Sequence, residues 1–415
     1  MNKYDISGEA GKAFARRIRT RVVGPRHGFG VVVPRELAPV CLRELSALGI
    51  TGAEPGEAGA EFNGRLKDAY LCNLRLRTAS RVFCRLPSFR AGIAEELFYK
   101  VSEVDWELWL SPDVPLEIDA HVEYSRISHE GKVVELVRDG IEKAIRQGPA
   151  AASELRAFRG EPAGKASEQS GEPAPKQRIL VHLVKNHCRI SIDMSGNHLH
   201  ERGYRTEHTG APLRETLAAA ILMKSEWNGD TPLVDGMCGS GTFPIEAALI
   251  ARRLPPGLGR EFLFQKWPSF QKQTWDYLCQ SARAASRAKA PAPIFGVDMD
   301  SESIRISGDN AKRAGVEGDI ELRCADFFEF DPRREKVKNG LLVLNPPYGK
   351  RLEGGGRSLY EKIGDQLRRA FGGWRYAVLC ASRGEAGAMK MPLMRLWGIR
   401  HGGIPIYAAL GKIPP

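Results

Sequence analysis

The sequence predicts an α/β protein, in which an N-terminal α+β region precedes a C-terminal, doubly wound and largely parallel sheet. Three observations carry this prediction. The chain has 415 residues, which is too long for one ordinary core and suggests two or three domains. Stretches with strand and helix periodicity alternate along it, most regularly beyond Tyr204. A segment rich in Ala, Gly, Pro, Ser and Glu, residues 148–177, interrupts the N-terminal pattern and is interpreted as a flexible insertion.

The composition excludes several classes of protein. Hydrophobic residues make up 42% and charged residues 27%, as in soluble globular chains. No apolar run approaches the roughly 20 residues that a membrane helix needs, and the N-terminus lacks the pattern of a signal peptide. The eight cysteines stand singly, without any Cys-x-x-Cys pair. We therefore expect a cytoplasmic protein with reduced cysteines, no membrane partner and no structural zinc.

The net charge of +11 is distributed unevenly. Residues 1–100 carry 17 basic and 10 acidic side chains, residues 101–250 carry 16 and 23, and residues 251–415 carry 28 and 17. Two basic ends therefore flank an acidic middle. An excess of this kind indicates a polyanionic partner, and the basic ends would form the surface that meets it.

The N-terminal half begins with an Arg-rich segment, residues 1–27, which is interpreted as a flexible basic arm. After it, apolar residues at helical spacing predict helices, and short apolar or alternating runs predict strands. The expected elements are, in order, a strand at 30–34, a helix at 36–48, a strand at 59–62, a helix at 66–74, a strand at 81–86, a helix at 95–104, a strand at 116–124 and a helix at 132–147. Strands at 178–184 and 188–194 look like a hairpin that resumes the same sheet.

The C-terminal half repeats strand and helix in the manner of a parallel sheet. The expected elements are a helix at 212–227, a strand at 232–234, a helix at 242–253, a strand at 294–297, a helix at 301–314, strands at 319–323 and 340–344, a helix at 358–371 and a strand at 375–379. A final stretch without an assigned element runs through Leu410.

A glycine-rich turn follows the first of these strands. The strand ends in Asp235, the turn holds Gly236, Gly239 and Gly241, and a helix opens at Thr242. Glycines allow positive φ and a close backbone approach to a ligand, and a helix N-terminus offers free N–H groups. A dinucleotide fingerprint would need glycine where this chain has proline, and a P-loop would need a lysine that is not there. The pattern suits S-adenosylmethionine (SAM), whose carboxylate would face the helix and whose ammonium group would lie near acidic or carbonyl oxygens.

The next two strands also end in acidic residues. Asp298 follows the second strand, where a carboxylate can accept hydrogen bonds from both ribose hydroxyls. Asp300 is expected to cap the following helix. After the third strand, Asp326 is placed to accept from the adenine amino group, and Phe327 to pack on the adenine ring.

A second motif, Asn345-Pro346-Pro347-Tyr348, ends an apolar strand. The two prolines stiffen the turn and remove backbone donors. The Asn345 side-chain oxygen and the Pro346 carbonyl can then accept hydrogen bonds from an exocyclic amine, which directs its lone pair toward an attacking geometry. Tyr348 would give a flat face for a base swung out of its helix. The predicted catalytic residues are therefore Asn345, Pro346 and Tyr348.

Taken together, these motifs resemble the THUMP-domain RNA methyltransferases, most closely the bacterial RlmL-like family of 23S rRNA guanine-N2 methyltransferases. The resemblance covers about residues 28–407 and extends to the segments 34–37, 73–81, 193–205 and 211–219. It implies a ferredoxin-like unit at 28–90, a THUMP RNA-binding domain at 91–203 and a SAM-dependent methyltransferase domain at 204–415. It also places Pro212 and Leu213 beside the cofactor, with Asp235, Gly239, Gly241, Thr242, Asp298, Asp326, Phe327 and Asn345.

The implied activity is methylation of the guanine N2 amine in 23S rRNA. The motif identifies an amine on a planar ring without saying which ring, so a tRNA guanine-N2 methyltransferase and an adenine-N6 methyltransferase remain alternatives. A non-catalytic, RNA-binding ribosome assembly factor is a third. One departure stands in the glycine turn, where the family usually has proline at the position of Gly236.

Two further patterns have a functional and a structural interpretation. His198-Leu-His200 could be half of a metal site, but no third ligand lies at a suitable spacing, and no metal is expected. Residues 252–289 interleave basic side chains with six aromatic ones. These aromatics are expected to pack a helical subdomain, the alternative being a stacking platform for single-stranded RNA.

Overall fold

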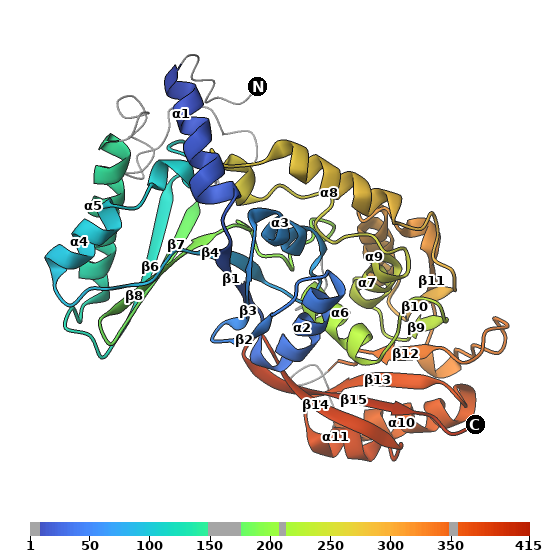
Figure 1. The fold of residues 1–415 in the computed structure, drawn as a ribbon. Helices are drawn as coiled ribbons and strands as arrows, with labels where there is room; N and C mark the ends of the chain where they lie inside the picture. The colour runs from blue at the N-terminus through green and yellow to red at the C-terminus, as the bar shows by residue number, and fades with distance from the viewer. Residues whose placement is uncertain (1–8, 148–175, 207–212, 348–355) are drawn as a thin grey trace.

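The computed structural model describes residues 9–147, 176–206, 213–347 and 356–415, which form two β-sheets with helices packed on them (Figure 1). The N-terminal sheet has eight strands and the C-terminal sheet seven. The expected α/β class, with an α+β region before a Rossmann-like sheet, is confirmed. No helix in the described ranges has the length and apolar character to cross a membrane.

The N-terminal sheet has the strand order β2-β3-β1-β4-β8-β7-β6, with β5 paired to β8. Only β6 and β7 run parallel among its described pairs. The predicted hairpin is confirmed, because β8 pairs with β4 and carries the sheet on into β7 and β6. The strands are β1 (His27–Val32), β2 (Glu54–Gly56), β3 (Gly59–Gly64), β4 (Arg81–Arg85), β5 (Phe89–Arg90), β6 (Leu116–Glu123), β7 (Gln177–Val184) and β8 (His187–Asp193). The short β2 and β5 were not predicted.

Helices cover this sheet at the predicted places, with ends that differ by a few residues. They are α2 (Ala38–Ala47), preceded by a 3₁₀ turn at Arg35–Leu37, α3 (Leu66–Arg75), α4 (Ala94–Ser102) and α5 (Glu130–Gln147). In Figure 1, α4 and α5 lie together beside β6, β7 and β8. The apolar side of α5 is buried, which explains its helical spacing of valine and isoleucine.

The N-terminal arm is folded where the structure describes it, so its interpretation as flexible is wrong for these residues. Helix α1 (Glu9–Ile18) continues into a π-helical turn, Arg19–Val23. Arg17 Nη2 donates to Asp105 Oδ1 at 2.6 Å and to Glu107 Oε1 at 2.5 Å. Val22 is fully buried. Two acidic partners that lie far along the chain thus hold this arginine.

The expected insertion ends earlier than predicted. Residues 148–175 lie outside the described part of the chain, but Gln177 begins β7 and is 2% exposed. Its side-chain nitrogen donates to the main-chain oxygen of Asp193 at 2.9 Å. Gln177 is polar and follows a polar run, so its place in a buried strand could not be recognised from local sequence.

The C-terminal sheet has the order β11-β10-β9-β12-β13-β15-β14. All neighbours from β11 to β13 are parallel, and β15 and β14 form an antiparallel edge. The chain builds outward from β9 to β11 and then returns to the other side of β9 as β12. The strands are β9 (Leu233–Asp235), β10 (Ile294–Asp298), β11 (Ile320–Cys324), β12 (Leu341–Leu344), β13 (Arg375–Cys380), β14 (Leu393–His401) and β15 (Ile404–Lys412).

The helices of this unit are α6 (Glu215–Lys224), α7 (Thr242–Ala251), α8 (Lys272–Ala284), α9 (Ser301–Arg313), α10 (Gly356–Ala370) and α11 (Arg383–Ala388). Apart from Thr242 and Glu246, helix α7 consists of apolar residues, and it is almost wholly buried, as expected for a helix enclosed by other elements. Its N-terminus is therefore fixed firmly beside the glycine turn.

The aromatic residues of segment 252–289 pack between the two units, which agrees with the expected packing role. Phe264 is fully buried, and its ring stacks on Tyr70 of α3 with centroids 4.3 Å apart. Trp267 Nε1 donates to Gln177 Oε1 at 2.8 Å. A stacking platform built from these buried rings is excluded. Tyr277, 67% exposed, is the exception.

A buried polar network also joins the two units. Arg202 Nε lies 3.3 Å from Glu246 Oε1 of α7, and their side chains are 2% and 0% exposed. Arg202 also donates to the main-chain oxygens of Leu199 (2.5 Å) and Arg77 (2.6 Å), and Arg77 itself donates to that of Leu254 at 2.6 Å. Because α7 begins at the glycine turn, this network anchors the turn against the N-terminal unit.

Candidate active site

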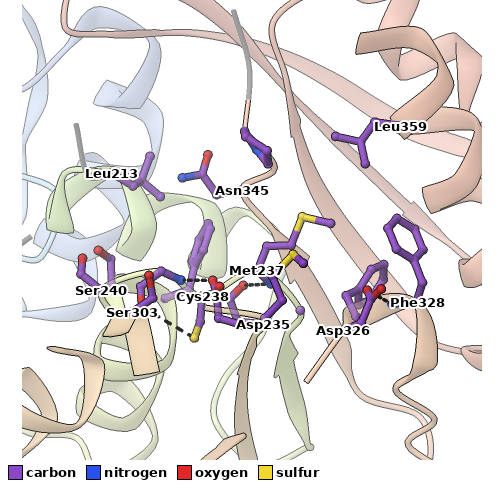
Figure 2. Close-up of a pocket in the computed structure, with 18 residues that line it drawn as sticks. Leu213, Asp235, Met237, Cys238, Ser240, Ser303, Asp326, Phe328, Asn345 and Leu359 are labelled. Carbon is purple, nitrogen blue, oxygen red and sulfur yellow. Dashed lines mark hydrogen bonds between the residues drawn. The ribbon is translucent and has the colours of Figure 1, made fainter. Parts of the chain in front are cut away.

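A pocket with a volume of about 450 Å³ lies at the carboxyl ends of β9, β10 and β12 (Figure 2). This is the point where the order of the parallel strands reverses, at which open α/β sheets bind their ligands. The volume lies within the range of roughly 300–1,000 Å³ that is typical of small-molecule and cofactor sites. Each strand contributes the polar residue that follows its buried apolar run.

The glycine turn forms one wall of this pocket. Gly239 and Gly241 have φ angles of +51° and +86°. A Cβ on Gly241 would lie 2.2 Å from Ser307 Oγ of α9, so a larger residue fits neither the conformation nor the space. Thr242 begins α7 directly after it. The turn thus brings the free N–H groups of a helix N-terminus to the pocket.

Asp298, at the end of β10, is tied to this turn. Its Oδ2 accepts from the Gly239 N–H at 2.8 Å, and its Oδ1 accepts from the Asp300 N–H at 3.0 Å. Each carboxylate oxygen therefore retains acceptor capacity for a ligand hydroxyl. Asp300 caps α9 as predicted, accepting from the N–H groups of Glu302 and Ser303.

Asp235 faces the same pocket from β9 and is 1% exposed. Burial, with a smaller contribution from the charge of Asp298, raises the pKa of the Asp235 carboxyl well above its usual value. Its Oδ1 accepts from the Met237 N–H at 3.2 Å. A positively charged ligand group next to Asp235 would favour the ionised form of this carboxyl.

The end of β11 closes another side. Asp326 is exposed, and its Oδ1 accepts from the Phe328 N–H at 2.9 Å. Phe327 lines the pocket but is only 2% exposed, and it packs on Phe371 with ring centroids 6.0 Å apart. Phe328 is half-buried, lines the pocket and lies beside Asp326 in Figure 2.

Asn345 is the residue of the site that most directly indicates a ligand. It follows β12 and lies with Leu213 across the pocket from Asp235 in Figure 2. Its Oδ1 atom is buried and accepts no hydrogen bond from any described residue. A buried acceptor without a donor is destabilising by roughly 1–3 kcal/mol. The oxygen is therefore poised for a donor brought by a ligand.

The structure thus brings most of the predicted site residues to one cavity. Those that line it are Leu213, Asp235, Gly239, Thr242, Asp298, Asp326, Phe327 and Asn345. Gly241 and Pro346 do not line it: Gly241 shapes the turn from behind, and Pro346 is buried next to Asn345. Pro212 and Tyr348 lie outside the described residues.

Other lining residues were not predicted. They are Gly236, Met237, Cys238, Ser240, Phe243, Met299, Ser303, Phe328, Pro347 and Leu359. Most are neighbours of predicted residues, and Phe328 could have been found because it adjoins Phe327. Leu359 comes from α10, which no local motif connects to the glycine turn.

The unusual Gly236 has a physical explanation. A Cβ at this position would lie 2.2 Å from the Phe327 ring and 2.8 Å from a methyl group of Leu344. Glycine therefore makes room for Phe327 between β9 and β12. The position of the Phe327 ring therefore explains why glycine stands at 236 in this chain.

The two histidines of the 198–200 segment do not form a metal site with other described residues. Their rings stack with centroids 5.1 Å apart, and each Nδ1 is buried without a hydrogen-bond partner among the residues that the structure describes. No cluster of three or more His, Cys, Asp or Glu side chains in the described ranges could hold a metal ion. Burial and nearby positive charge lower the pKa of both rings to about 4. The positively charged groups near them are Arg81, Arg178, Arg202, Arg205, Arg214 and Arg260, and one acidic group, Glu201 Oε1, lies 4.0 Å from His200 Nε2.

These histidines predict an acid-sensitive fold. Their pKa is about 4 in the folded chain and about 6.5 when unfolded, so the unfolded chain binds more protons between these values. Stability is therefore expected to fall as the pH drops from 6.5 to 4. In His198→Gln/His200→Gln the thermal midpoint should depend less on pH over this window, measured by calorimetry in steps of half a pH unit. Equal pH dependence in parent and variant would contradict the assignment.

Comparison with known proteins places this site in a family. Residues 202–394 match the model of the RMKL-like methyltransferase domain, and residues 29–83 match that of the RlmL ferredoxin-like domain. A candidate RNA methyltransferase of Synechocystis sp. is 32% identical over 382 residues, which cover 91% of this chain and 94% of that protein. The ribosomal RNA large subunit methyltransferase K/L of Methylococcus capsulatus is 36% identical over 85% of this chain and 46% of its own length. That of Vibrio parahaemolyticus is 33% identical over 88% and 50%. The chain thus spans about half the length of these K/L enzymes.

Solved structures agree with this assignment. A candidate methyltransferase crystallised with S-adenosylhomocysteine (SAH) has a TM-score of 0.78 at 26% identity, covering 95% of this chain and all of that one. A protein from Listeria monocytogenes, described as a predicted N6-adenine-specific DNA methylase, has a TM-score of 0.78 at 29% identity, covering 93% of this chain and 96% of that one. TrmN of Thermus thermophilus shares the fold. It has a TM-score of 0.62 at 16% identity, covering 94% of this chain and all of that one. The chain that carries the glycine turn, the strand-end carboxylates and Asn345 thus belongs to the RlmL-like methyltransferase family.

Proposed function

We propose that the protein is a cytoplasmic, SAM-dependent RNA methyltransferase that forms N2-methylguanosine, with 23S rRNA as its substrate. The observation that carries this proposal is the buried Asn345 Oδ1, which has no hydrogen-bond partner among the described residues and belongs to a residue that lines a pocket whose other walls suit an adenosine cofactor. An amine is the donor that this oxygen lacks.

The pocket residues fit SAM, which supplies a methyl group on a sulfonium centre when it is bound. Thr242 and the N–H groups at the start of α7 suit its carboxylate. The remaining acceptor capacity of Asp298 suits the ribose hydroxyls. Asp326 and the neighbouring phenylalanines suit the adenine edge and face. A relative crystallised with SAH supports the same choice.

Asn345 would hold the substrate amine. Its Oδ1 would accept a hydrogen bond from one N–H of the amine, and the carbonyl of Pro346, which adjoins Asn345 but does not itself line the cavity, would accept one from the other N–H, which leaves the nitrogen lone pair directed into the pocket. Proline at 346 and 347 keeps this turn stiff, so that the acceptor positions are set before the base arrives. Catalysis then comes mainly from positioning. The base reaches the pocket by leaving its helix, at a cost of a few kcal/mol.

The choice of ribosomal RNA rests on relatives. Proteins 33–36% identical to this chain are named as ribosomal RNA large subunit methyltransferases. The N-terminal units would bind structured RNA by shape and phosphate contacts. An adenine-N6 methyltransferase is the second candidate, because the similar Listeria protein is described as acting on adenine.

Mapping of modified nucleosides tests this proposal. RNA from cells with and without the protein would be digested and analysed by mass spectrometry, with 23S rRNA and tRNA kept separate. We expect N2-methylguanosine to disappear at a 23S rRNA position and to return when the gene is restored. Loss from tRNA alone, or loss of N6-methyladenosine instead, would replace the proposed substrate.

The ribose assignment gives a separate prediction. Asp298→Ala removes a charged acceptor, and such hydrogen bonds contribute about 1.5–3 kcal/mol. We expect the Kd for SAM to rise by about 10- to 150-fold in calorimetric titration. Asp300→Ala is the matched control, since Asp300 caps α9 without lining the pocket, and it should bind SAM almost as the parent does. Unchanged affinity in Asp298→Ala would eliminate the ribose role.

A further inference from the structure

A second pocket, of about 250 Å³, lies where the N-terminal unit meets the methyltransferase sheet. Its basic residues come from four elements: Arg43 from α2, Lys224 from the end of α6, Arg375 from the start of β13 and Arg395 from β14. Glu226 is the one acidic side chain among its described lining residues. The pocket therefore has an excess of three positive charges.

Three of these cations form no ion pair with a described residue, although the carboxylate of Glu226 is near enough to Lys224 to oppose the repulsion in part, and Lys224 Nζ lies 5.6 Å from the centre of the Trp397 ring. Arg375 Nη1 donates to the main-chain oxygens of Ser225 (2.9 Å) and Glu226 (3.2 Å), so its role is to hold the end of α6. Arg43, Lys224 and Arg395 form no ion pair there. Burial together with the charges of Arg395 and Arg43 lowers the pKa of the Lys224 ammonium. These three cations line one pocket, Lys224 is close enough to both arginines to be repelled by them, and an anion between the three groups would relieve that repulsion.

The pocket lies at the amino ends of the parallel strands, whereas the candidate active site lies at their carboxyl ends. Arg375 is the first residue of β13 and pairs with Leu341, the first residue of β12, whereas Asn345 follows the last. The four residues of β12 separate these two ends of the sheet by about 13 Å. An anion held here could not be part of the cofactor or of the base in the active site.

We infer that this pocket binds a phosphate group of the substrate RNA backbone, an inference that rests on the proposed function. Guanidinium groups match phosphate oxygens with paired hydrogen bonds, and the lysine adds a compact charge. Tyr376, the aromatic residue that lines the pocket, is 1% exposed and offers no face for a base. The site would therefore position the RNA without reading its sequence, leaving base choice to the active site.

The test compares two variants with equal loss of charge. Arg43→Ala/Lys224→Ala/Arg395→Ala removes the pocket cations and leaves the anchoring Arg375 in place. Lys289→Ala/Lys312→Ala/Arg334→Ala removes three exposed cations elsewhere. Binding of a 23S rRNA transcript from the source organism is measured over a series of KCl concentrations. We expect the pocket variant to bind at least tenfold more weakly at 0.1 M KCl. The slope of log K against log salt should become shallower by about 0.7–0.9 for each phosphate that the variant no longer neutralises.

SAM affinity and the thermal midpoint should match the parent in both variants, which shows that the fold and active site are intact. An equal loss of RNA affinity in the two variants, or an unchanged salt slope in the pocket variant, would overturn the inference. Micromolar binding of pyrophosphate that the pocket variant loses, with RNA affinity unchanged, would reassign the pocket to a small phosphate compound. Failure of the parent itself to bind the transcript would overturn the proposed function and this inference together.

Discussion

Asn345→Ala is expected to fold and bind SAM but to transfer methyl groups about 10²–10³ times more slowly than the parent. This is the loss seen when one preorganised hydrogen-bonding group is removed from an active site. The reason lies in the buried Oδ1, which follows β12 and has no hydrogen-bond partner in the part of the chain that the structure describes, so that a substrate amine can supply one. The measurement is single-turnover transfer of radiolabelled methyl groups to the 23S rRNA transcript.

The variant Asn345→Asp distinguishes the loss of the hydrogen bond that orients the substrate amine from the loss of side-chain packing at this position. It keeps an oxygen acceptor at the same place, so it should retain more activity than Asn345→Ala. Calorimetry with SAM and a thermal melt identify any loss that comes from the fold. Near-normal turnover in Asn345→Ala would remove this residue from catalysis.

Arg202→Ala is expected to reduce the free energy of unfolding by about 3–5 kcal/mol, because it leaves the carboxylate of Glu246 buried without its counter-charge. The effect should appear in urea unfolding followed by tryptophan fluorescence. Arg305→Ala is the matched control. It removes a half-exposed arginine that pairs with Glu302 and Asp309, and such surface pairs contribute at most about 1 kcal/mol.

A double variant distinguishes loss of the pair from loss of packing. Arg202→Met/Glu246→Leu removes both charges and should recover much of the stability that the single variant loses. An Arg202→Ala protein whose free energy of unfolding stays within about 1 kcal/mol of the parent, the range of a surface pair, would show that the network does not join the two units.

The parts of the fold that follow from local pattern could be predicted from the sequence. The parallel strands β9, β10 and β12 are short apolar runs; β9 and β10 end in an aspartate and β12 is followed directly by Asn345, so both the sheet and the position of its ligand site could be inferred. The glycines of the turn and the cap at Asp300 have local conformational causes, so they could be predicted as well.

Features that depend on distant partners could not be predicted. The edge strands β14 and β15 were missed. Half of β14 is exposed, so its own sequence shows only part of a strand pattern, and its pairing with β15 is what completes the strand. The folded N-terminal arm depends on Asp105 and Glu107, and the order of Gln177 depends on Trp267. Arginine and glutamine at such places look like surface residues until the fold brings their partners to them.

The central claim is that one pocket presents a methyl donor to an amine held by Asn345, and a crystal structure with bound SAM tests it most directly. The account predicts the adenosine between Asp298 and Asp326, with the sulfonium methyl group turned toward Asn345. Density for the donor elsewhere, or with its methyl group facing away from that residue, would contradict it.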